Sequence, residues 1–550
     1  MQFRKKQIIL LWYGENCIPP EKAERLLFFF MIENWNDSFG ELLRDFENAP
    51  EINRENLKII LADNRNTDYG KKHGFQTIGS AEEYTARLPY TDYSQYRGRI
   101  CTPGFFTAYP IRDVLGTSGT TGGQKQFPVT EKALERYSSY ILEAPFLMND
   151  MHGKWLHASV FRDLDTVTIL SASYYLYLLK TGKYTYPRHV GQLELFFSNR
   201  IPDVFYVKIW LALANPDLEA FCSVFLYDIS LLFRDMEKRW ETVLSDMENR
   251  RISGNVPPEI GELLLQNLPS PARLCELREE FQKGFDTPIL PRLWKKVRFI
   301  SGIGGGLYQF QERALRHYVG DVATHYFAYA SSECMIGIAV EMGTPHYALL
   351  PRTAYYEFLP YEGEGMIPLE EVKEGGVYEL VITTFSGLYR YKTGDLVKII
   401  SFIGKTPVVE ICGRRRYMLD IVGEKIDGYT ATLAVDTWAK KEGLHLSDYA
   451  IGINTEGTPS GYYVFVEGKN VPHDPAYGKR FDEVLCALAP DYADVRGFNI
   501  IACPKVRLVD SGDIARATTE GKVAHSKPHL FLNEEQTKAL YERSEQHGKR

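Results

Sequence analysis

The sequence has no pair of cysteines close enough to bind zinc or to form a redox dithiol. Its eight cysteines are scattered singly along 550 residues, and none stands in a CxxC arrangement. An HExxH zinc motif is also lacking. Isolated cysteines are typical of chains in a reducing compartment, where a thiol packs as a small hydrophobic group. We therefore expect a cytoplasmic protein without structural disulfides.

Long hydrophobic runs and a surplus of positive charge are lacking too. The longest apolar runs, such as residues 26–32, fall well short of the roughly 20 residues that a membrane span needs. Arg4, Lys5 and Lys6 precede a short apolar run, but Glu15 and Asn16 follow it without a cleavage site, so we expect no export signal. A net charge of -7 with a pI near 6.0 argues against a nucleic-acid partner.

What the sequence does contain is the composition of a large globular protein. It is 44% hydrophobic and 25% charged, without an internal repeat or a low-complexity segment. The first hundred residues are predicted to be mainly helical, with Phe39, Leu42, Leu43 and Phe46 on one face. A further helix is predicted from Glu131 with Thr130 as its N-cap.

The middle of the chain reads first as helix and then as strand. A long helical stretch is predicted over residues 217–249, with Leu218, Phe221, Val224, Phe225 and Leu232 as its buried stripe. From residue 297 onward, β-branched runs bounded by Gly, Pro or Asp predict strands. These runs are residues 297–300, 377–383, 396–402 and 408–412.

A smaller region follows residue 416. Residues 449–454 and 461–466 predict a hairpin, residues 499–509 a further strand, and residues 533–547 a closing helix. Alternating helices and strands followed by a compact α+β tail predict an α/β fold of two domains, residues 1–416 and 417–550.

The segment from Thr117 to Lys125, TSGTTGGQK, is the most informative local feature. Glycines let backbone N–H groups converge on an anion, hydroxyls add donors, and the lysine adds a mobile positive charge. Such a loop suits a polyphosphate, although it does not fit the Walker A pattern. The alternative is an exposed flexible loop.

Two further segments carry carboxylates beside polar groups. In Tyr329-Ala-Ser-Ser-Glu333 the carboxylate could hold Mg²⁺ beside a phosphate, or the segment is a helix start capped by serine. In the segment GLYRYKTGD, Asp395 follows a glycine turn at the head of a strand and could accept both ribose hydroxyls. The alternative is an ordinary turn aspartate.

Basic residues in CGRRR, residues 412–416, and Lys527 near the C-terminus are, taken alone, ordinary surface groups. Other signatures fail: Gly302–Gly306 does not complete GxGxxG, and Ser118 is not in a GxSxG elbow.

The order of these segments nevertheless resembles the acyl-CoA synthetase, adenylation-domain and luciferase superfamily. More narrowly, the chain resembles the auxin-responsive Gretchen Hagen family of acyl acid amido synthetases. The narrower match rests on YASSE (329–333), GLYRY (387–391), NTDYG (66–70) and the helix-like stretch 221–248. It implies a large N-terminal domain of β-sheets and a β-barrel flanked by helices, and a smaller mobile α+β C-terminal domain.

The resemblance also implies an activity with ATP and Mg²⁺. A carboxylic acid is adenylated to acyl-AMP, and an amine, typically an amino acid, then displaces AMP to form an amide. The implied catalytic residues are Lys125, Glu333, which also binds the metal, and Lys527. Implied nucleotide contacts are Ser118, Thr120, Thr121, Gly122, Gly304, Gly305, Gly306, Tyr308, Tyr329, Ser331, Ser332, Asp395 and Arg414.

Two alternatives remain at this point. An acyl-CoA ligase would use the same first step with a thiol as the acceptor, and a non-catalytic nucleotide-binding regulator would not turn over. The sequence does not identify the acid, the amine or the acyl pocket.

Overall fold

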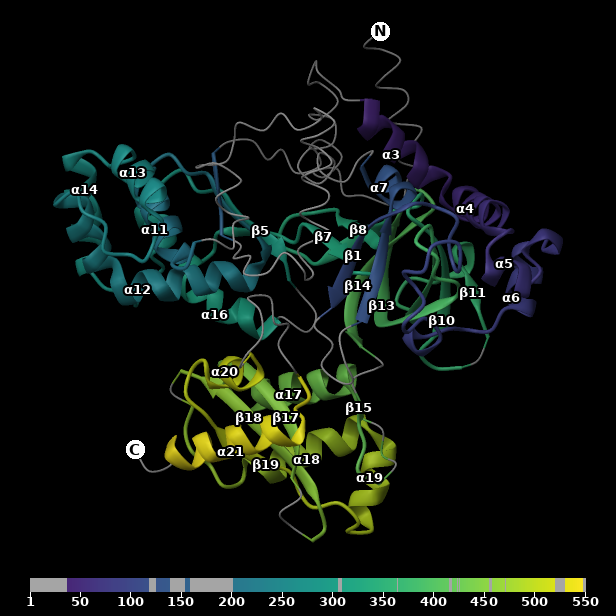
Figure 1. Ribbon diagram of the computed structural model, residues 1–550. Coiled ribbons are helices and arrows are strands. Elements are labelled where there is room, and N and C mark those ends of the chain that lie inside the picture. Colours follow the sequence, from purple (N-terminus) through teal and green to yellow (C-terminus); the bar gives the residue numbers. More distant parts are fainter. Residues whose placement is uncertain are drawn as a thin grey trace, which may run out of the picture.

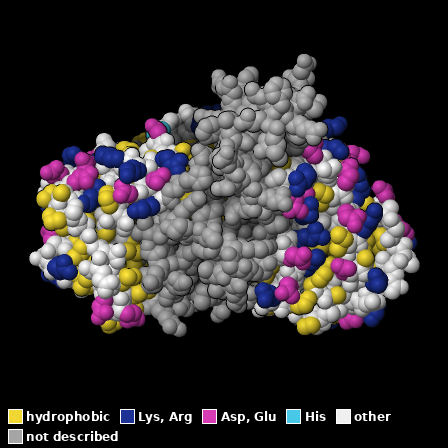
Figure 2. Space-filling model, turned by 90° about the horizontal axis from the view of Figure 1, so that it is seen from above, with side chains coloured by type: hydrophobic (Ala, Val, Ile, Leu, Met, Phe, Trp, Pro, Cys, Tyr) yellow, Lys and Arg dark blue, Asp and Glu magenta, His cyan; other side chains and the backbone are white. Residues whose placement is uncertain are grey.

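The computed structural model describes most of the chain, with gaps. The described residues are 37–117, 125–138, 154–158, 201–304, 309–363, 365–414, 418–422, 424, 426–454, 458–469, 471–519 and 530–547. Among them, no helix has the length and apolar character needed to cross a membrane. Lys and Arg side chains are interspersed with Asp and Glu over the described parts of the face in Figure 2.

Short helices open the described chain, as predicted. They are α3 (Asp37–Glu47), α4 (Ala49–Asn64), α5 (Asp68–Lys72), η1 (Phe75–Thr77), α6 (Ala81–Arg87) and η2 (Tyr93–Gln95). Leu42 and Phe46 on α3 are fully buried, which confirms the predicted apolar face at these two positions. These helices cover one side of the large sheet drawn at the right of Figure 1.

A parallel sheet forms the second layer. Its strands run in the order β3 (Trp155–His157), β4 (Ala220–Phe225), β5 (Phe299–Ile303) and β6 (Ala323–His325). The connecting helices are α11 (Val204–Ala214), α12 (Leu226–Glu248), α13 (Pro258–Gln266), α14 (Pro271–Gln282), α15 (Leu290–Leu293) and α16 (Gln309–Val319).

The predicted helix over residues 217–249 is therefore wrong in its first part. Residues 220–225 form β4, and the helix begins only at Leu226. Phe221 is fully buried because β4 lies between β3 and β5. A strand buried on both faces reads as a continuous apolar run, which periodicity alone does not separate from a buried helix.

The third layer is an antiparallel sheet of eight strands. Its order is β11-β10-β12-β13-β14-β9-β8-β7. The strands are β7 (Ala328–Ala330), β8 (Met335–Ala339), β9 (His346–Leu349), β10 (Ala354–Pro360), β11 (Ile367–Pro368), β12 (Val377–Thr384), β13 (Tyr391–Ile403) and β14 (Thr406–Arg414). A separate hairpin pairs β1 (Ile111–Thr117) with β2 (Lys125–Thr130), and α7 (Glu131–Ser138) follows it.

Several local predictions are confirmed. The N–H of Ala133 donates to the Thr130 hydroxyl at 3.2 Å, so Thr130 caps α7. β12, β13 and β14 contain the three apolar runs predicted as strands after residue 377. The mixed α/β class, with a large sheet-rich body flanked by helices, is confirmed as well.

The C-terminal residues form their own layer of sheet and helix, drawn in yellow-green below the rest in Figure 1. Its strands are β15 (Met418–Leu419), β16 (Ile426–Asp427), β17 (Leu446–Asn454), β18 (Gly461–Gly468) and β19 (Lys505–Leu508). Its helices are α17 (Gly428–Glu442), α18 (Tyr477–Leu488), α19 (Pro490–Gly497), α20 (Asp513–Thr519) and α21 (Glu534–His547). The predicted hairpin and closing helix are confirmed, whereas the last strand is shorter than the predicted 499–509.

The hydrophobic cores separate along the chain. One cluster of buried side chains runs from Leu42 to Val409, and the next begins at Leu419. Near the change, the Tyr361 hydroxyl donates to Asp427 at 2.9 Å, and Asp427 also caps α17.

Candidate active site

The turn end of the β1–β2 hairpin borders the predicted phosphate loop. Thr117 pairs with Lys125 across the hairpin, so the loop leaves and returns at one point. Ser118, Thr120, Thr121 and Gly122 lie outside the described residues, and their phosphate contacts stay predictions. The Lys125 ammonium lies 5.5 Å from the centre of the Tyr93 ring, a distance at which a cation is attracted to the aromatic face.

Tyr329 and Asp395 meet inside the large sheet, although 66 residues separate them in the chain. The Tyr329 hydroxyl donates to Asp395 Oδ2 at 2.8 Å. Both side chains are only 3% exposed, so this charge-assisted bond forms away from bulk water. Through this bond Tyr329 fixes the orientation of the Asp395 carboxylate, and both residues are predicted nucleotide contacts.

A bulge in β13 carries Asp395. Glu379 of β12 pairs with Leu396 and Val381 pairs with Lys392, so three residues of β13 oppose Leu380 alone. Gly394 has φ +80°, a left-handed conformation that favours glycine. Asp395 thus lies within a strand rather than at its head, and the predicted glycine turn is this bulge.

The Thr393 hydroxyl stabilises the same bulge. It donates to the carbonyl of Leu380 at 2.8 Å and accepts from the N–H of Asp395 at 3.1 Å. The side chain therefore satisfies backbone groups that the irregular ladder would otherwise leave without partners.

Glu333 lies in the turn between β7 and β8, and the alternative of a serine-capped helix is wrong. Within the turn, the Ser331 hydroxyl accepts from the N–H of Cys334 at 3.2 Å. The Tyr391 hydroxyl lies 3.4 Å from Glu333 Oε1 and donates to it. Ser331, Ser332 and Glu333 are half-buried, so this turn stays partly open to solvent.

Gly304 directly follows the parallel strand β5 and lies in a crowded position. A Cβ placed there would collide with the Glu312 carboxylate and with Leu226 Cδ1, at 2.6 Å from the latter. The Tyr347 hydroxyl reaches the Gly304 carbonyl at 3.4 Å, and the Tyr347 ring centre lies 6.0 Å from that of Tyr329. Burial, with Glu312 second, raises the pKa of Tyr347 well above its usual value, so the hydroxyl stays protonated and can donate.

Aromatic rings connect the turn end of the β1–β2 hairpin to Glu333. Tyr93 packs on Phe127 at 5.3 Å between ring centres, and Phe127 packs edge-on against Tyr391 at 6.2 Å. Lys125 and Glu333 therefore stand at the two ends of one packed wall. The structure thus brings together Gly304, Tyr329, Glu333 and Asp395, and connects Lys125 to them.

Some predicted contacts are not placed. Gly305, Gly306, Tyr308 and Lys527 lie outside the described residues, as does the side chain of Arg414. The backbone of Arg414 pairs with Asp395 across β13 and β14. Sequence reasoning missed Tyr93 and Tyr347, because a tyrosine in a predicted strand or turn carries no local sign of its partner.

Comparisons with family models match three parts of the chain. The GH3 family N-terminal domain matches residues 39–324, the central domain residues 347–414 and the C-terminal domain residues 429–534. The chain belongs to the GH3 family. The first match alone covers more than half of the chain, and the resemblance inferred from the sequence is confirmed.

Curated relatives of this GH3 chain are synthetases. Jasmonoyl--L-amino acid synthetase GH3.5 of Oryza sativa subsp. japonica is 27% identical, over 92% of this chain and 96% of the relative. Indole-3-acetic acid-amido synthetase GH3.5 of Arabidopsis thaliana is 25% identical, over 82% of this chain and 81% of the relative. The predicted enzyme class, an acyl acid amido synthetase, is thus the class of these relatives.

A solved structure shows the same fold. It is the AtGH3.15 acyl acid amido synthetase in complex with 2,4-DB, with a TM-score of 0.80 and 23% identity. The match covers 93% of this chain and 98% of that protein.

Proposed function

We propose that this GH3 protein is an ATP-dependent amido synthetase that adenylates a carboxylic acid and transfers the acyl group to an amino acid. One observation carries the proposal: Tyr329 and Glu333 from one sequence motif and Asp395 from another converge beside the hairpin that borders the predicted phosphate loop. The amide-forming relatives favour an amine over a thiol as the acceptor.

In the first step, a carboxylate oxygen of the acid attacks the α-phosphorus of ATP, and the bond to pyrophosphate breaks. We assign the β- and γ-phosphates to Ser118, Thr120, Thr121, Gly122 and Lys125. The hydroxyls of Ser331 and Ser332 face the α-phosphate in this proposal.

The nucleoside would lie on the opposite wall. Asp395, held by Tyr329, accepts the ribose hydroxyls, with Arg414 in support on the neighbouring strand. Gly304, Gly305, Gly306 and Tyr308 lie along the adenine. The glycine at 304 leaves room for the ends of the Glu312 and Leu226 side chains beside this segment.

Glu333 is the residue that would hold Mg²⁺. Within the described part of the chain, no three His, Cys, Asp or Glu side chains gather as a metal site. A single carboxylate fits nonetheless, because Mg²⁺ bound with ATP takes most of its ligands from phosphates and water. The ion would neutralise charge on the phosphates.

In the second step, the amine nitrogen attacks the acyl carbon and AMP leaves with the former carboxylate oxygen. We propose that a mobile C-terminal domain, residues 417–550, moves against residues 1–416 between the two steps. The separate hydrophobic cores support this division. Arg416 would serve as the hinge, and Lys527 would stabilise charge at the α-phosphate during adenylation.

The proposed partners are small molecules only, a carboxylic acid and an amino acid, with no nucleic acid and no membrane. We place the activity in the cytoplasm. None of the seven cysteines that the structure describes forms a disulfide, which fits a reducing compartment.

The test is a panel of acids crossed with amines, scored by pyrophosphate release and product mass. Acid-dependent exchange of pyrophosphate into ATP is expected, followed by a product with the mass of an amide. Products formed with coenzyme A and not with any amine would indicate a thiol acceptor. Nucleotide binding without exchange for any acid would indicate a regulator instead of an enzyme.

A further inference from the structure

Arg390 is a buried arginine in a backbone conformation that side chains rarely adopt. Its φ is +46°, and its side chain is only 4% exposed. The left-handed region disfavours a residue with a Cβ on the order of tenfold relative to glycine. Contacts from the rest of the protein must therefore hold this residue in place. The GLYRY segment alone gives no reason for an arginine at position 390.

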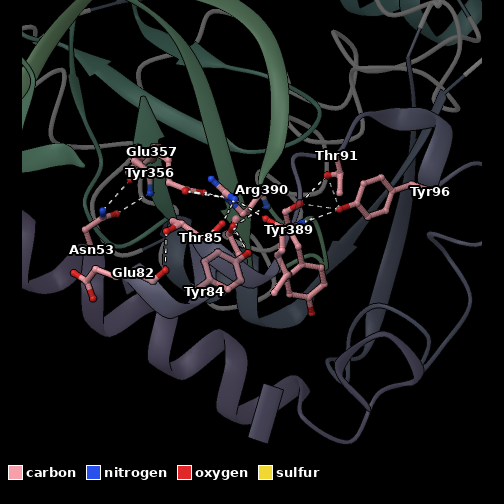
Figure 3. Close-up of polar contacts among 12 residues, drawn as sticks. Asn53, Glu82, Tyr84, Thr85, Thr91, Tyr96, Tyr356, Glu357, Tyr389 and Arg390 are labelled. Carbon is pink, nitrogen blue, oxygen red and sulfur yellow. Dashed lines mark hydrogen bonds and ion pairs between the residues drawn. The ribbon is translucent and has the colours of Figure 1, made fainter. Parts of the chain in front are cut away.

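The guanidinium is held on three sides (Figure 3). Nε donates to Glu357 Oε1 at 3.1 Å, and Nη1 donates to the carbonyls of Thr85 and Leu88 at the end of α6. The Tyr90 ring lies beneath it, at 4.4 Å from its centre. Arg390 thus fastens the large sheet to the helical segment that covers it.

Glu357 is fully buried and shares the contact. Burial raises the pKa of Glu357 to about 7, and the guanidinium opposes that rise. A planar guanidinium can serve a carboxylate and two carbonyls at once, whereas an ammonium is a single point charge. The cluster therefore calls for arginine specifically.

Thr91 fixes the backbone on both sides of Arg390. Its N–H donates to the Arg390 carbonyl and its carbonyl accepts from the N–H of Lys392, both at 2.9 Å. Its hydroxyl donates to the carbonyl of Tyr389 at 2.7 Å. The segment from 389 to 392 is thereby clamped just before the bulge begins.

Two site residues depend on that clamp. Tyr391 is the next residue, and its hydroxyl donates to Glu333. Asp395 is the last residue of the bulge. We propose that Arg390 is a positioning residue for the nucleotide site: it holds the left-handed turn from which Tyr391 reaches Glu333 and the bulge presents Asp395. This inference rests on the proposed function, because it assumes that ATP binds here.

The test compares Arg390→Ala with Arg390→Gly by ATP titration calorimetry and thermal unfolding. Both lose the guanidinium contacts, so both should have a lower Tm. Only glycine adopts the positive φ without strain. We expect ATP to bind about tenfold more weakly to Arg390→Ala, and within about threefold of wild type to Arg390→Gly. A purely structural arginine would leave the glycine variant at least as impaired as the alanine variant.

Arg273→Ala is the matched control. Arg273 is 6% exposed and donates to the carbonyl of Leu293 on the helical side of the molecule. This variant should lose stability with unchanged ATP affinity. Tyr90→Leu is a milder change, and this variant should fold and bind ATP about threefold more weakly. It replaces Arg390→Ala as the test of the positioning role if that variant does not fold.

The outcomes separate the two proposals. The positioning role would be overturned if Arg390→Ala bound ATP with wild-type affinity, or if the alanine and glycine variants lost affinity equally. If Arg390→Ala does not fold, wild-type ATP affinity in Tyr90→Leu would overturn it. A wild-type protein that binds no ATP would instead refute the proposed function.

Discussion

Replacing Tyr329 by Phe removes one hydroxyl from the centre of the candidate site and leaves the ring in place. The lost bond is the 2.8 Å contact with Asp395, in which both side chains are 3% exposed. A hydrogen bond to a charged group contributes about 1.5–3 kcal/mol. Because the carboxylate stays buried without this donor, we expect the free energy of unfolding to fall by about that amount.

The effect on ATP should be specific. Without the hydroxyl, Asp395 loses the contact that orients it for the proposed ribose binding, and we expect the KM for ATP to rise about tenfold, or about 1.4 kcal/mol. Asp395→Ala sets the upper limit, because it removes the acceptor itself. The assay is acid-dependent pyrophosphate release at varied ATP, together with thermal unfolding.

Tyr356→Phe is the control for this experiment. Tyr356 is also fully buried, in β10 of the same sheet, but its hydroxyl donates to the carbonyl of Leu350 at 3.1 Å. It should lose stability and keep its KM. If both tyrosine variants show the same KM for ATP, the contact between Tyr329 and Asp395 is structural, and Asp395 does not bind the ribose in the way proposed here.

Four other substitutions test separate parts of the molecule. Glu333→Ala should fold normally and release pyrophosphate on the order of 100-fold more slowly, since metal-assisted charge stabilisation amounts to several kcal/mol; near wild-type rates would remove Glu333 from the site. Burial lowers the pKa of His325 to about 3, so between pH 6.5 and 3 the unfolded chain binds a proton that the folded chain does not. The free energy of unfolding should therefore fall as the pH drops, by about 2 kcal/mol from this residue at pH 5. His325→Asn should flatten the plot of denaturant midpoint against pH over this range. An unchanged slope would contradict the lowered pKa of His325. Arg416→Pro should impair one half-reaction more than the other. Lys527→Ala should spare amide formation from supplied acyl-AMP, because its proposed role ends with pyrophosphate release. The two half-reactions are assayed separately, and equal losses in both would make both residues structural.

Sequence reasoning succeeded where the signal is local. Thr130 is a cap with a helix directly after it, and the runs after residue 377 are bounded by turn residues. Such features depend on a few neighbouring residues. The order of the motifs, compared with a known family, then supplied the class of enzyme.

It failed or stopped where partners come from distant segments. β4 looked like a helix because burial on both faces erases the alternation that marks a strand. The sequence predicted a glycine turn before Asp395, but it did not predict that the strand continues on both sides of that glycine. Nothing local predicts that Tyr329 reaches Asp395, or that Arg390 crosses to Thr85 and Leu88.

The bulge in β13 has a further consequence for how such a site can arise or disappear. It inserts two residues relative to β12, an even number, so the inward and outward faces of the strand keep their assignment beyond it. Loss of one residue there would turn the apolar face of the rest of β13 outward and unfold the sheet. Loss of both Thr393 and Gly394 would leave a regular ladder. A descendant of this protein could therefore lose the proposed ribose contact through one in-frame deletion of two codons and retain its fold.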